Sequence, residues 1–191
     1  MGKTLHKPPN EFRVIAGQWR GRTLSLQGSH ELRPTPNRVR ETLFNWLGQD
    51  MRGARCLDLF AGSGALGIEA LSRGAESCDF VELDKSSARQ IRTNLETLKV
   101  PTSHYTVTAK PAIEFLKMIT PGQYDLIFLD PPFNQNMIES LVRQLEPIAL
   151  TPCFIYLEIE KKSQLPELPE NWTLFREKTA GQVRYHLVLV E

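Results

Sequence analysis

The sequence has few of the residues, and none of the long apolar runs, that mark secreted, membrane-bound or metal-binding proteins. It contains three cysteines, Cys56, Cys78 and Cys153, and four scattered histidines. Because the cysteines are odd in number and each lies in an apolar, strand-like context, we interpret them as buried reduced thiols. No apolar run approaches the length of a membrane span, and the amino terminus lacks an apolar signal core. We therefore expect a cytoplasmic protein with no metal site and no membrane partner.

The composition fits one soluble globular domain with a small appendage. The chain has 191 residues, of which 41% are hydrophobic and 24% charged. The formal net charge is only +1, but residues 1–55 hold ten Lys and Arg against four Asp and Glu, whereas the remainder holds 13 against 18. A basic segment joined to an acidic domain is typical of a nucleic-acid anchor, because Lys and Arg bind phosphate by releasing counterions. A solvated surface with chance clustering of charge is the alternative.

The amino-terminal quarter predicts a flexible tail, a small hairpin and a helix. Residues 1–10 form the polar tail, and two short strands, 12–16 and 22–26, flank a bend that contains glycines. The stiff connector Arg33-Pro34-Thr35-Pro36 leads to an amphipathic helix from Asn37, capped by Asn37 or Thr35. We interpret residues 11–52 as an RNA-binding appendage to a main domain over residues 53–191.

After Gly53, strands and helices alternate, which predicts an α/β fold with a doubly wound, mostly parallel sheet. The expected strands are residues 55–60, 77–83, 105–108, 124–129 and 154–159, and the expected helices are residues 65–72, 86–98, 112–118 and 137–145. The last two segments, 172–178 and 183–190, predict an antiparallel hairpin around Ala180-Gly181.

A polar tetrapeptide, Asp130-Pro131-Pro132-Phe133, follows directly on the expected buried strand 124–129. Ligands of parallel sheets bind beyond the carboxyl ends of the strands, so this position indicates a site. The prolines fix the backbone and donate no hydrogen bond, which leaves Asp130 and the Pro131 carbonyl as rigid acceptors beside the Phe133 ring. Such a surface suits a planar base with an exocyclic amino group. We therefore predict that Asp130, Pro131, Pro132 and Phe133 are catalytic.

A glycine loop follows the first strand of the main domain, with glycines at positions 62, 64 and 67 that match the dinucleotide fingerprint. Its backbone can approach a ligand closely, and the amides that open the next helix attract an anionic group. Asp58 favours S-adenosylmethionine over a dinucleotide, because a carboxylate there repels pyrophosphate but can help to hold an ammonium group. An NAD site and a purely structural turn are the alternatives. The cofactor-binding residues predicted here are Asp58, Phe60, Ala61, Gly62, Ser63 and Gly64.

Two acidic residues lie at the end of the second strand of the main domain. Glu82 is placed where a carboxylate can accept hydrogen bonds from both hydroxyls of a ribose. Asp84 competes for this role, but its position before Lys85 and Ser86 favours helix capping.

These motifs resemble those of class I S-adenosylmethionine-dependent methyltransferases that act on exocyclic amino nitrogens. The resemblance rests on Asp58 to Gly67, on Glu82 and on Asp130-Pro131-Pro132-Phe133. The amino-terminal segment makes the resemblance more specific. Its stretches 13–22, 33–36 and 39–47 resemble the RsmD family of bacterial ribosomal RNA methyltransferases. The similarity covers nearly the whole chain, including Ala180-Gly181-Gln182-Val183 near its end.

The RsmD resemblance implies transfer of a methyl group from S-adenosylmethionine to N2 of a guanine in 16S rRNA, at RNA position 966. It implies a Rossmann-like fold and a partner in the small ribosomal subunit, and we expect a monomer. Phe133 would stack on the target base. One departure concerns the adenine pocket, because Ala109-Lys110-Pro111-Ala112-Ile113 lacks the acidic or amide residue common in this class. We therefore expect adenine to contact the backbone near Ala112 and the apolar side chains of Leu83 and Ile113.

The basic residues of the amino-terminal segment are candidates for RNA docking, because arginine suits both phosphate and base stacking. An alternative for some of them is pairing with acids of the main domain, and Trp19 could either stack on a base or pack beneath the hairpin. The predicted RNA-binding residues are Arg13, Arg20, Arg22, Arg33, Arg38 and Arg40.

Three other functions remain compatible with the motifs. DNA adenine-N6 or protein amide methyltransferases use similar Asp- or Asn-Pro-Pro-aromatic sites, although the chain has no separate target-recognition domain. An NAD-dependent oxidoreductase is disfavoured by Asp58 and by the lack of a proton-relay histidine. A non-catalytic RNA-binding factor in ribosome assembly would retain the fold without turnover.

Overall fold

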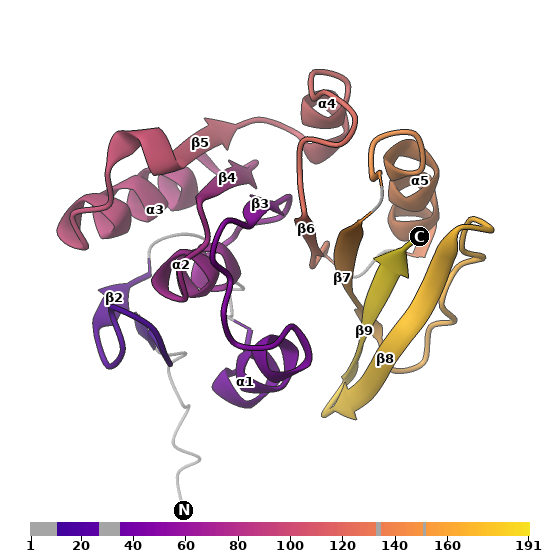
Figure 1. The fold of residues 1–191 in the computed structure, drawn as a ribbon, viewed down its shortest axis with the longest axis horizontal. Coiled ribbons are helices and arrows are strands. Elements are labelled where there is room, and N and C mark those ends of the chain that lie inside the picture. The colour runs from indigo at the N-terminus through magenta and orange to yellow at the C-terminus, as the bar shows by residue number, and fades with distance from the viewer. Residues whose placement is uncertain (1–10, 27–34, 133–134, 151) are drawn as a thin grey trace, which may run out of the picture.

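The fold is organised around a seven-stranded sheet, seen in a computed structural model that describes residues 11–26, 35–132, 135–150 and 152–191. The strand order is β5-β4-β3-β6-β7-β9-β8 (Figure 1). Strands β3 to β7 are parallel to one another, and β9 runs antiparallel to both β7 and β8. The strands are β3 (Arg55–Asp58), β4 (Ser77–Glu82), β5 (Tyr105–Ala109), β6 (Leu126–Leu129), β7 (Cys153–Glu160), β8 (Trp172–Ala180) and β9 (Val183–Val190).

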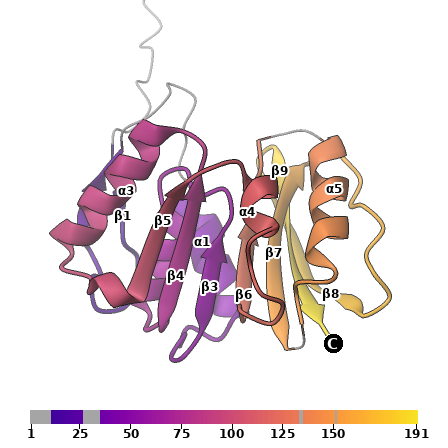
Figure 2. The ribbon, with the colours of Figure 1, turned by 90° about the horizontal axis from the view of Figure 1, so that it is seen from above.

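Helices cover both faces of this sheet, which makes it doubly wound (Figures 1 and 2). One face carries α1 (Asn37–Trp46), α2 (Ala65–Ser72) and α3 (Lys85–Thr97), and the other carries α4 (Ala112–Leu116) and α5 (Gln135–Leu145). Successive residues of a strand enter opposite cores, as Phe128 and Leu129 of β6 do. A strand buried on both faces needs apolar residues at every position, which explains the continuous run Leu-Ile-Phe-Leu in β6. The α/β prediction is confirmed.

The predicted amino-terminal hairpin and helix are present, and they share the core of the main domain. The hairpin pairs β1 (Glu11–Arg13) with β2 (Thr23–Ser25) in antiparallel register. Phe12 and Leu24 from these strands and Phe44 from α1 are buried in the same apolar cluster as the residues of α2 and α3. Residues 11–26 and 35–52 are therefore packed against the main domain, and their position relative to the sheet is fixed.

A buried carboxylate holds this segment in place. Glu69 of α2 is fully buried and accepts hydrogen bonds from the backbone N–H of Ile15 at 2.9 Å and of Ala16 at 3.0 Å. The same carboxylate lies 3.5 Å from Arg40 Nη1 and 2.9 Å from Arg73 Nε. One side chain of the main domain thus joins the hairpin, α1 and the end of α2.

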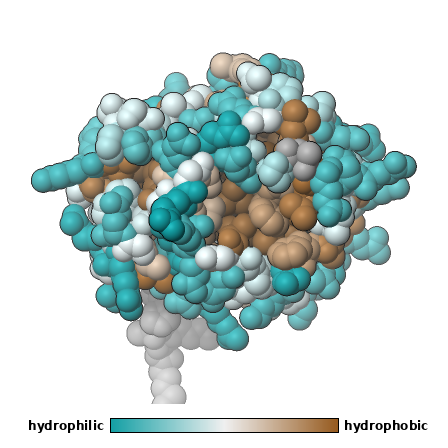
Figure 3. All heavy atoms as spheres, viewed as in Figure 1, coloured by the Kyte–Doolittle hydropathy of each residue, from teal (hydrophilic) through white to brown (hydrophobic). Residues whose placement is uncertain are grey.

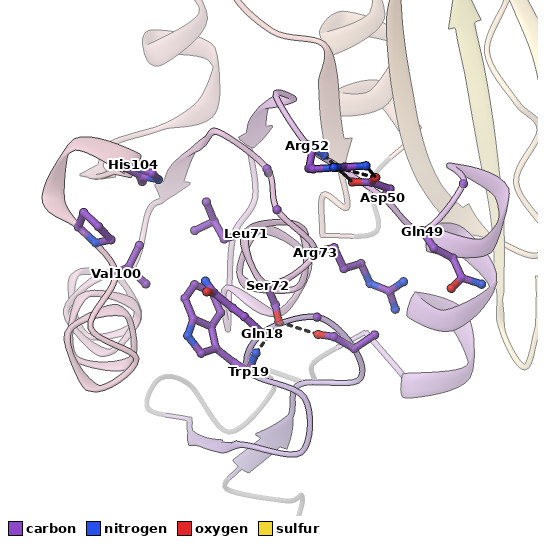
Figure 4. A pocket seen from close by; sticks show the side chains of 16 residues that line it. Gln18, Trp19, Gln49, Asp50, Arg52, Leu71, Ser72, Arg73, Val100 and His104 are labelled. Carbon is purple, nitrogen blue, oxygen red and sulfur yellow. Dashed lines mark hydrogen bonds and ion pairs between the residues drawn. The ribbon is translucent and has the colours of Figure 1, made fainter.

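The bend of the hairpin docks on the last turn of α2, as Figure 4 shows. Ser72 Oγ donates to the Ala16 carbonyl at 2.6 Å and accepts from Trp19 N at 3.1 Å, while the Ser72 carbonyl accepts from Gln18 N at 2.8 Å. Gly17 makes this approach possible, because its φ is +79° and a Cβ there would lie 1.8 Å from Ser72 O. The indole of Trp19 is half-buried against the core, which agrees with packing beneath the hairpin.

Most predicted elements are confirmed within a few residues of their ends, but the capping of α1 is wrong. The residue before α1 is Pro36, and no side chain caps the helix. Thr35 instead donates its hydroxyl to Asp130, and Asn37 Oδ1 accepts from Arg40 Nη2 at 2.6 Å. Thr35 is thus used in a tertiary contact, which a local sequence pattern does not reveal, whereas Asn37 is itself the first residue of α1 and binds a side chain of the next turn. The predicted strand 55–60 also ends earlier, at Asp58.

The cysteines and the surface agree with the composition. All three cysteines are buried and free, as predicted. Within the described ranges, no helix has the length and apolar character needed to cross a bilayer. Figure 3 shows a largely hydrophilic face on which apolar side chains gather in a central hollow, where Figure 1 draws β6 and β7.

We expect Gly17→Ala to detach the hairpin bend from α2. The substitution should lower the free energy of unfolding by roughly 1–2 kcal/mol for the positive φ, and by about 1 kcal/mol more for each hydrogen bond that is lost. Gly53→Ala is the matched control, because Gly53 has φ +78° and open space around its Cβ position. Urea unfolding should show a loss of stability at least twice as large for Gly17→Ala. Equal losses would contradict the tight packing at Gly17.

Candidate active site

The predicted site residues converge at the carboxyl ends of three neighbouring strands. Asp58 ends β3, Glu82 ends β4, and Asp130 follows β6. The chain runs outward from β3 through β4 to β5 and then returns to β6 on the other side of β3. The connections after β3 and β6 therefore diverge, which creates the crevice where open α/β sheets bind ligands.

The glycine loop forms a tight turn between β3 and α2. Gly62 and Gly64 have φ values of +50° and +76°, and Gly64 N donates to the Ala61 carbonyl at 2.6 Å. Gly67 serves a different purpose, because a Cβ there would lie 2.3 Å from the Phe80 ring. The first two glycines shape the loop, and the third lets α2 pack closely on β4.

Glu82 connects this loop to the end of β4. Its Oε2 accepts from Gly62 N at 2.7 Å and its Oε1 from Asp84 N at 2.8 Å. Each carboxylate oxygen has a second lone pair, so the group retains capacity for two further donors. Asp84 caps α3 by accepting from Ser87 N at 2.8 Å, which confirms the predicted capping.

Asp58 lies buried beneath the glycine loop, with 2% of its surface exposed. Its Oδ2 accepts a hydrogen bond from Gly67 N at 3.1 Å. Burial raises the pKa of Asp58 to about 7, although the hydrogen bond from Gly67 opposes this shift. The side chain therefore supports the loop from below.

Asp130 is half-buried at the mouth of β6, next to the buried Pro131 and the exposed Pro132. Its Oδ2 accepts a hydrogen bond of 3.4 Å from Thr35 Oγ1. Burial raises the pKa of Asp130 to about 6, while the Thr35 hydroxyl favours the charged form. Phe133 lies outside the described residues, so its stacking role stays a prediction.

Sequence reasoning missed two residues near Asp130. The sequence predicts Thr35 as part of a connector or as a cap of α1, and only the folded chain brings it to the site. Glu158, in the middle of β7, is buried and accepts a hydrogen bond of 2.5 Å from Tyr156 Oη. A carboxylate inside the apolar strand Phe-Ile-Tyr-Leu-Glu-Ile was the available signal.

The expected adenine-binding residues flank the crevice beside Glu82. The side chain of Leu83 is 69% exposed and that of Ile113 36%, so both offer apolar surface to a ligand. Ala112 begins α4 after Pro111, and α4 contacts β4. This arrangement suits a flat apolar ring, and the binding role itself stays a prediction.

Of the six predicted RNA-binding arginines, four are exposed, one is buried and one lies outside the described residues. Arg13, Arg20, Arg22 and Arg38 are exposed, whereas Arg33 lies outside the described residues. Arg40 is fully buried, donates to the Arg13 carbonyl at 2.8 Å and pairs with Glu69, so its prediction as an RNA contact is wrong. The alternative of pairing with an acid of the main domain holds for Arg40.

A separate cavity of about 740 Å³ lies at the opposite end of the sheet (Figure 4). Its walls come from the hairpin bend and from the segments that precede β3, β4 and β5, and include Trp19, Leu71, Val100 and His104. None of the predicted catalytic or cofactor residues lines it. We therefore place the chemistry at the carboxyl ends, where the carboxylates and the glycine loop meet.

We expect Asp58→Asn to flatten the pH dependence of stability. Because the folded pKa of Asp58, about 7, exceeds the unfolded value of about 3.9, the folded state keeps a proton that the unfolded state has lost. Stability contributed by this group therefore falls as pH rises between these values. Asparagine has no proton to lose but can still accept from Gly67.

Thermal unfolding between pH 5 and 8 checks this prediction. Below about pH 7, the wild-type melting temperature should fall more steeply with pH than that of Asp58→Asn, by roughly 3 °C per pH unit. Asp50→Asn is the control, because Arg52 lowers the pKa of Asp50 and moves its titration below this range. Parallel curves for wild type and Asp58→Asn would contradict the raised pKa.

Solved structures share this architecture along nearly the whole chain. The putative methyltransferase yhhF from Escherichia coli superposes with a TM-score of 0.85 at 45% identity, covering 95% of this chain and 98% of that one. The putative methylase HI0767 from Haemophilus influenzae gives 0.80 at 45% identity, covering 94% and 98%. SMU.776, a putative methyltransferase complexed with SAH, shares the fold at a TM-score of 0.69 and 17% identity, covering 95% and 56%.

Sequence comparison gives the family. A family model described as "Conserved hypothetical protein 95" matches residues 12–189. Ribosomal RNA small subunit methyltransferase D of Escherichia coli is 45% identical over 98% of this chain and 94% of its own length. The protein of the same name from Haemophilus influenzae is 49% identical over 93% of both chains. The chain therefore belongs to the family of ribosomal RNA small subunit methyltransferase D, the RsmD family that its motifs resemble.

Proposed function

We propose that this protein transfers a methyl group from S-adenosylmethionine to N2 of a guanine in 16S rRNA, at RNA position 966. The observation that carries the proposal is the placement of Asp130 and Pro131 beside the glycine loop and Glu82, in a chain 45% identical to a named ribosomal RNA methyltransferase. The fold neighbour complexed with SAH supports the choice of methyl donor.

The cofactor lies along the ends of β3 and β4. The Glu82 carboxylate accepts hydrogen bonds from the ribose hydroxyls. The backbone of the loop from Phe60 to Gly64 lies along the amino acid moiety of the cofactor. Asp58 acts from beneath the loop, because its burial keeps it from the surface of the crevice. Leu83 and Ala112 form the walls of the adenine pocket. A dinucleotide fits this site less well, because its pyrophosphate would lie beside the carboxylates of Glu82 and Asp130, with the carboxyl group of Asp58 beneath the loop.

The reaction needs an amino group with an available lone pair. In guanine the N2 lone pair is delocalised into the ring, and hydrogen bonds from its two protons to Asp130 and the Pro131 carbonyl favour a more pyramidal nitrogen. N2 then attacks the sulfonium methyl in line, so that the N–C bond forms as the C–S bond breaks. S-adenosylhomocysteine leaves and N2 releases one proton. Positioning and electrostatics supply most of the acceleration.

RNA binds along the amino-terminal segment, which reaches this crevice at Thr35. The exposed arginines of the hairpin and α1 are Arg13, Arg20, Arg22 and Arg38. Thr35 links the same segment to Asp130, so RNA held there is close to the acceptor groups. A paired guanine would have to leave its stack to reach Asp130.

Transfer of labelled methyl tests this function. The protein is incubated with S-adenosylmethionine and either naked 16S rRNA, assembled small subunits or DNA, and the nucleosides are analysed. We expect N2-methylguanine in RNA, and Asp130→Ala should lower turnover by roughly 10²–10³-fold with cofactor binding retained. N6-methyladenine in DNA would refute the proposal, and absence of turnover on every substrate would favour a non-catalytic assembly factor.

We expect the double substitution of Arg20 and Arg22 by Gln to weaken RNA binding and to reduce the slope of log K against log salt by roughly 2. Cofactor affinity should not change, because neither side chain lies near Glu82 or the glycine loop. The matched control replaces the exposed Arg143 and Arg176 by Gln, which removes the same charge elsewhere. Equal salt slopes for both double variants would show that the hairpin does not dock RNA.

A further inference from the structure

A second carboxyl group lies beside Asp130 on the neighbouring strand. The parallel register of β6 and β7 pairs Phe128 with Tyr156 and Leu129 with Leu157, so Asp130 and Glu158 are the next residues in line. Adjacent strands lie about 4.8 Å apart. The rings of Phe128 and Tyr156 meet on the α1 face of the sheet, with centroids 6.3 Å apart, and side chains two residues further on return to that face.

The pair lies at the edge of the buried core, with Glu158 on its inner side. Glu158 is only 4% exposed and lies opposite Tyr185 of β9. The titratable and polar groups that face the pair are Asp58 from β3, Thr35 from the segment before α1, Tyr156 from β7 and Tyr185 from β9. No ion pair of the described residues involves Asp130 or Glu158.

Two carboxylates side by side in such a site resist ionising together near neutral pH, because each charge repels the other and the buried Glu158 is shielded from water. We propose that Asp130 and Glu158 share one proton, that Glu158 holds it, and that Glu158 is thereby a positioning residue for methyl transfer. This inference rests on the proposed function, since it assigns Asp130 the role of charged acceptor for the target amine.

The surroundings of the two carboxyl groups indicate that Glu158, and not Asp130, keeps the proton. Asp130 is only half-buried, at the open end of its strand, so it loses less hydration than Glu158, and the hydrogen bond from the Thr35 hydroxyl favours its charged form. Glu158 lies deeper, two residues before the end of β7. Its burial and the nearby Asp130 raise the pKa of Glu158 to about 8, and this outweighs the opposing hydrogen bond from Tyr156.

The shared proton has a consequence for the reaction. Near neutral pH the pair carries a single negative charge, located at Asp130, where the amino protons of guanine arrive. When Glu158 also ionises, the two charges repel and Asp130 is pushed from its place beside the Pro131 carbonyl. Glu158 does not touch the substrate in this scheme, and its effect is exerted through Asp130.

A direct test measures the protonation of Glu158 without any methyl transfer. Carbon-13 resonances of glutamate carboxyls are followed against pH, and Glu158 is identified as the signal missing in Glu158→Gln. We expect it to titrate well above the exposed glutamates, and to titrate at lower pH in Asp130→Asn, where the neighbouring charge is gone. An ordinary titration in the wild type, or no change in Asp130→Asn, would overturn the shared proton.

A kinetic test separates positioning from a structural role. Wild-type kcat/KM for methyl transfer should decline by roughly 10-fold per pH unit above about pH 8, as the second proton leaves. Glu158→Gln should lose this decline, because glutamine has no such proton and can still accept from Tyr156. Glu160→Gln, an exposed position on the same strand, should keep it.

The outcomes distinguish this inference from the proposed function. If Glu158→Gln lowers activity equally at every pH and keeps the decline, Glu158 is only structural and the inference fails while methyl transfer stands. If no methyl transfer occurs on any RNA or DNA, the proposed function fails and the carbon-13 titration alone decides whether the proton is shared.

Discussion

The position of the amino-terminal segment depends on one buried carboxylate. Glu69 binds two backbone N–H groups of the hairpin bend and two arginines, and it has no access to solvent. A buried charge of this kind is tolerated only when its partners are in place, and removing one partner costs about 3–5 kcal/mol. Because the helix that carries Glu69 begins at the glycine loop, the glycine loop and the amino-terminal hairpin are built on one rigid element.

The site contains two kinds of carboxyl group, some stabilised in the charged form by hydrogen bonds and others with a raised pKa. Glu82 and Asp84 are satisfied by backbone N–H groups at the rim, whereas Asp58, Asp130 and Glu158 lie where water is scarce. The first two are ready to accept hydrogen bonds from a ligand or to cap a helix. The other three have raised pKa values, and such values cluster where proteins bind charged ligands or transfer protons.

Sequence patterns predicted the features that depend on neighbouring residues in the chain. The limits of α2 and the cap of α3 follow from local spacing, and the resemblance of the motifs led to the right family. The patterns failed for Arg40, Thr35 and Glu158, since each depends on a contact between distant segments. The sequence of an amphipathic helix does not show whether a basic residue such as Arg40 contacts RNA or the buried Glu69. Its partner depends on how the helix packs against the rest of the fold.

The strand order has a consequence for how the sheet assembles. β9 follows β8 in the chain, yet it lies between β7 and β8 and pairs with both. Among the described strands, β8 therefore has no neighbour in the sheet until β9 has inserted beside β7. Tyr185 of β9 lies opposite Glu158 of β7, so the surroundings of Glu158 also close only at this step. The edge of the sheet and the buried wall of the candidate site thus form together, when one strand enters between two strands that precede it in the chain.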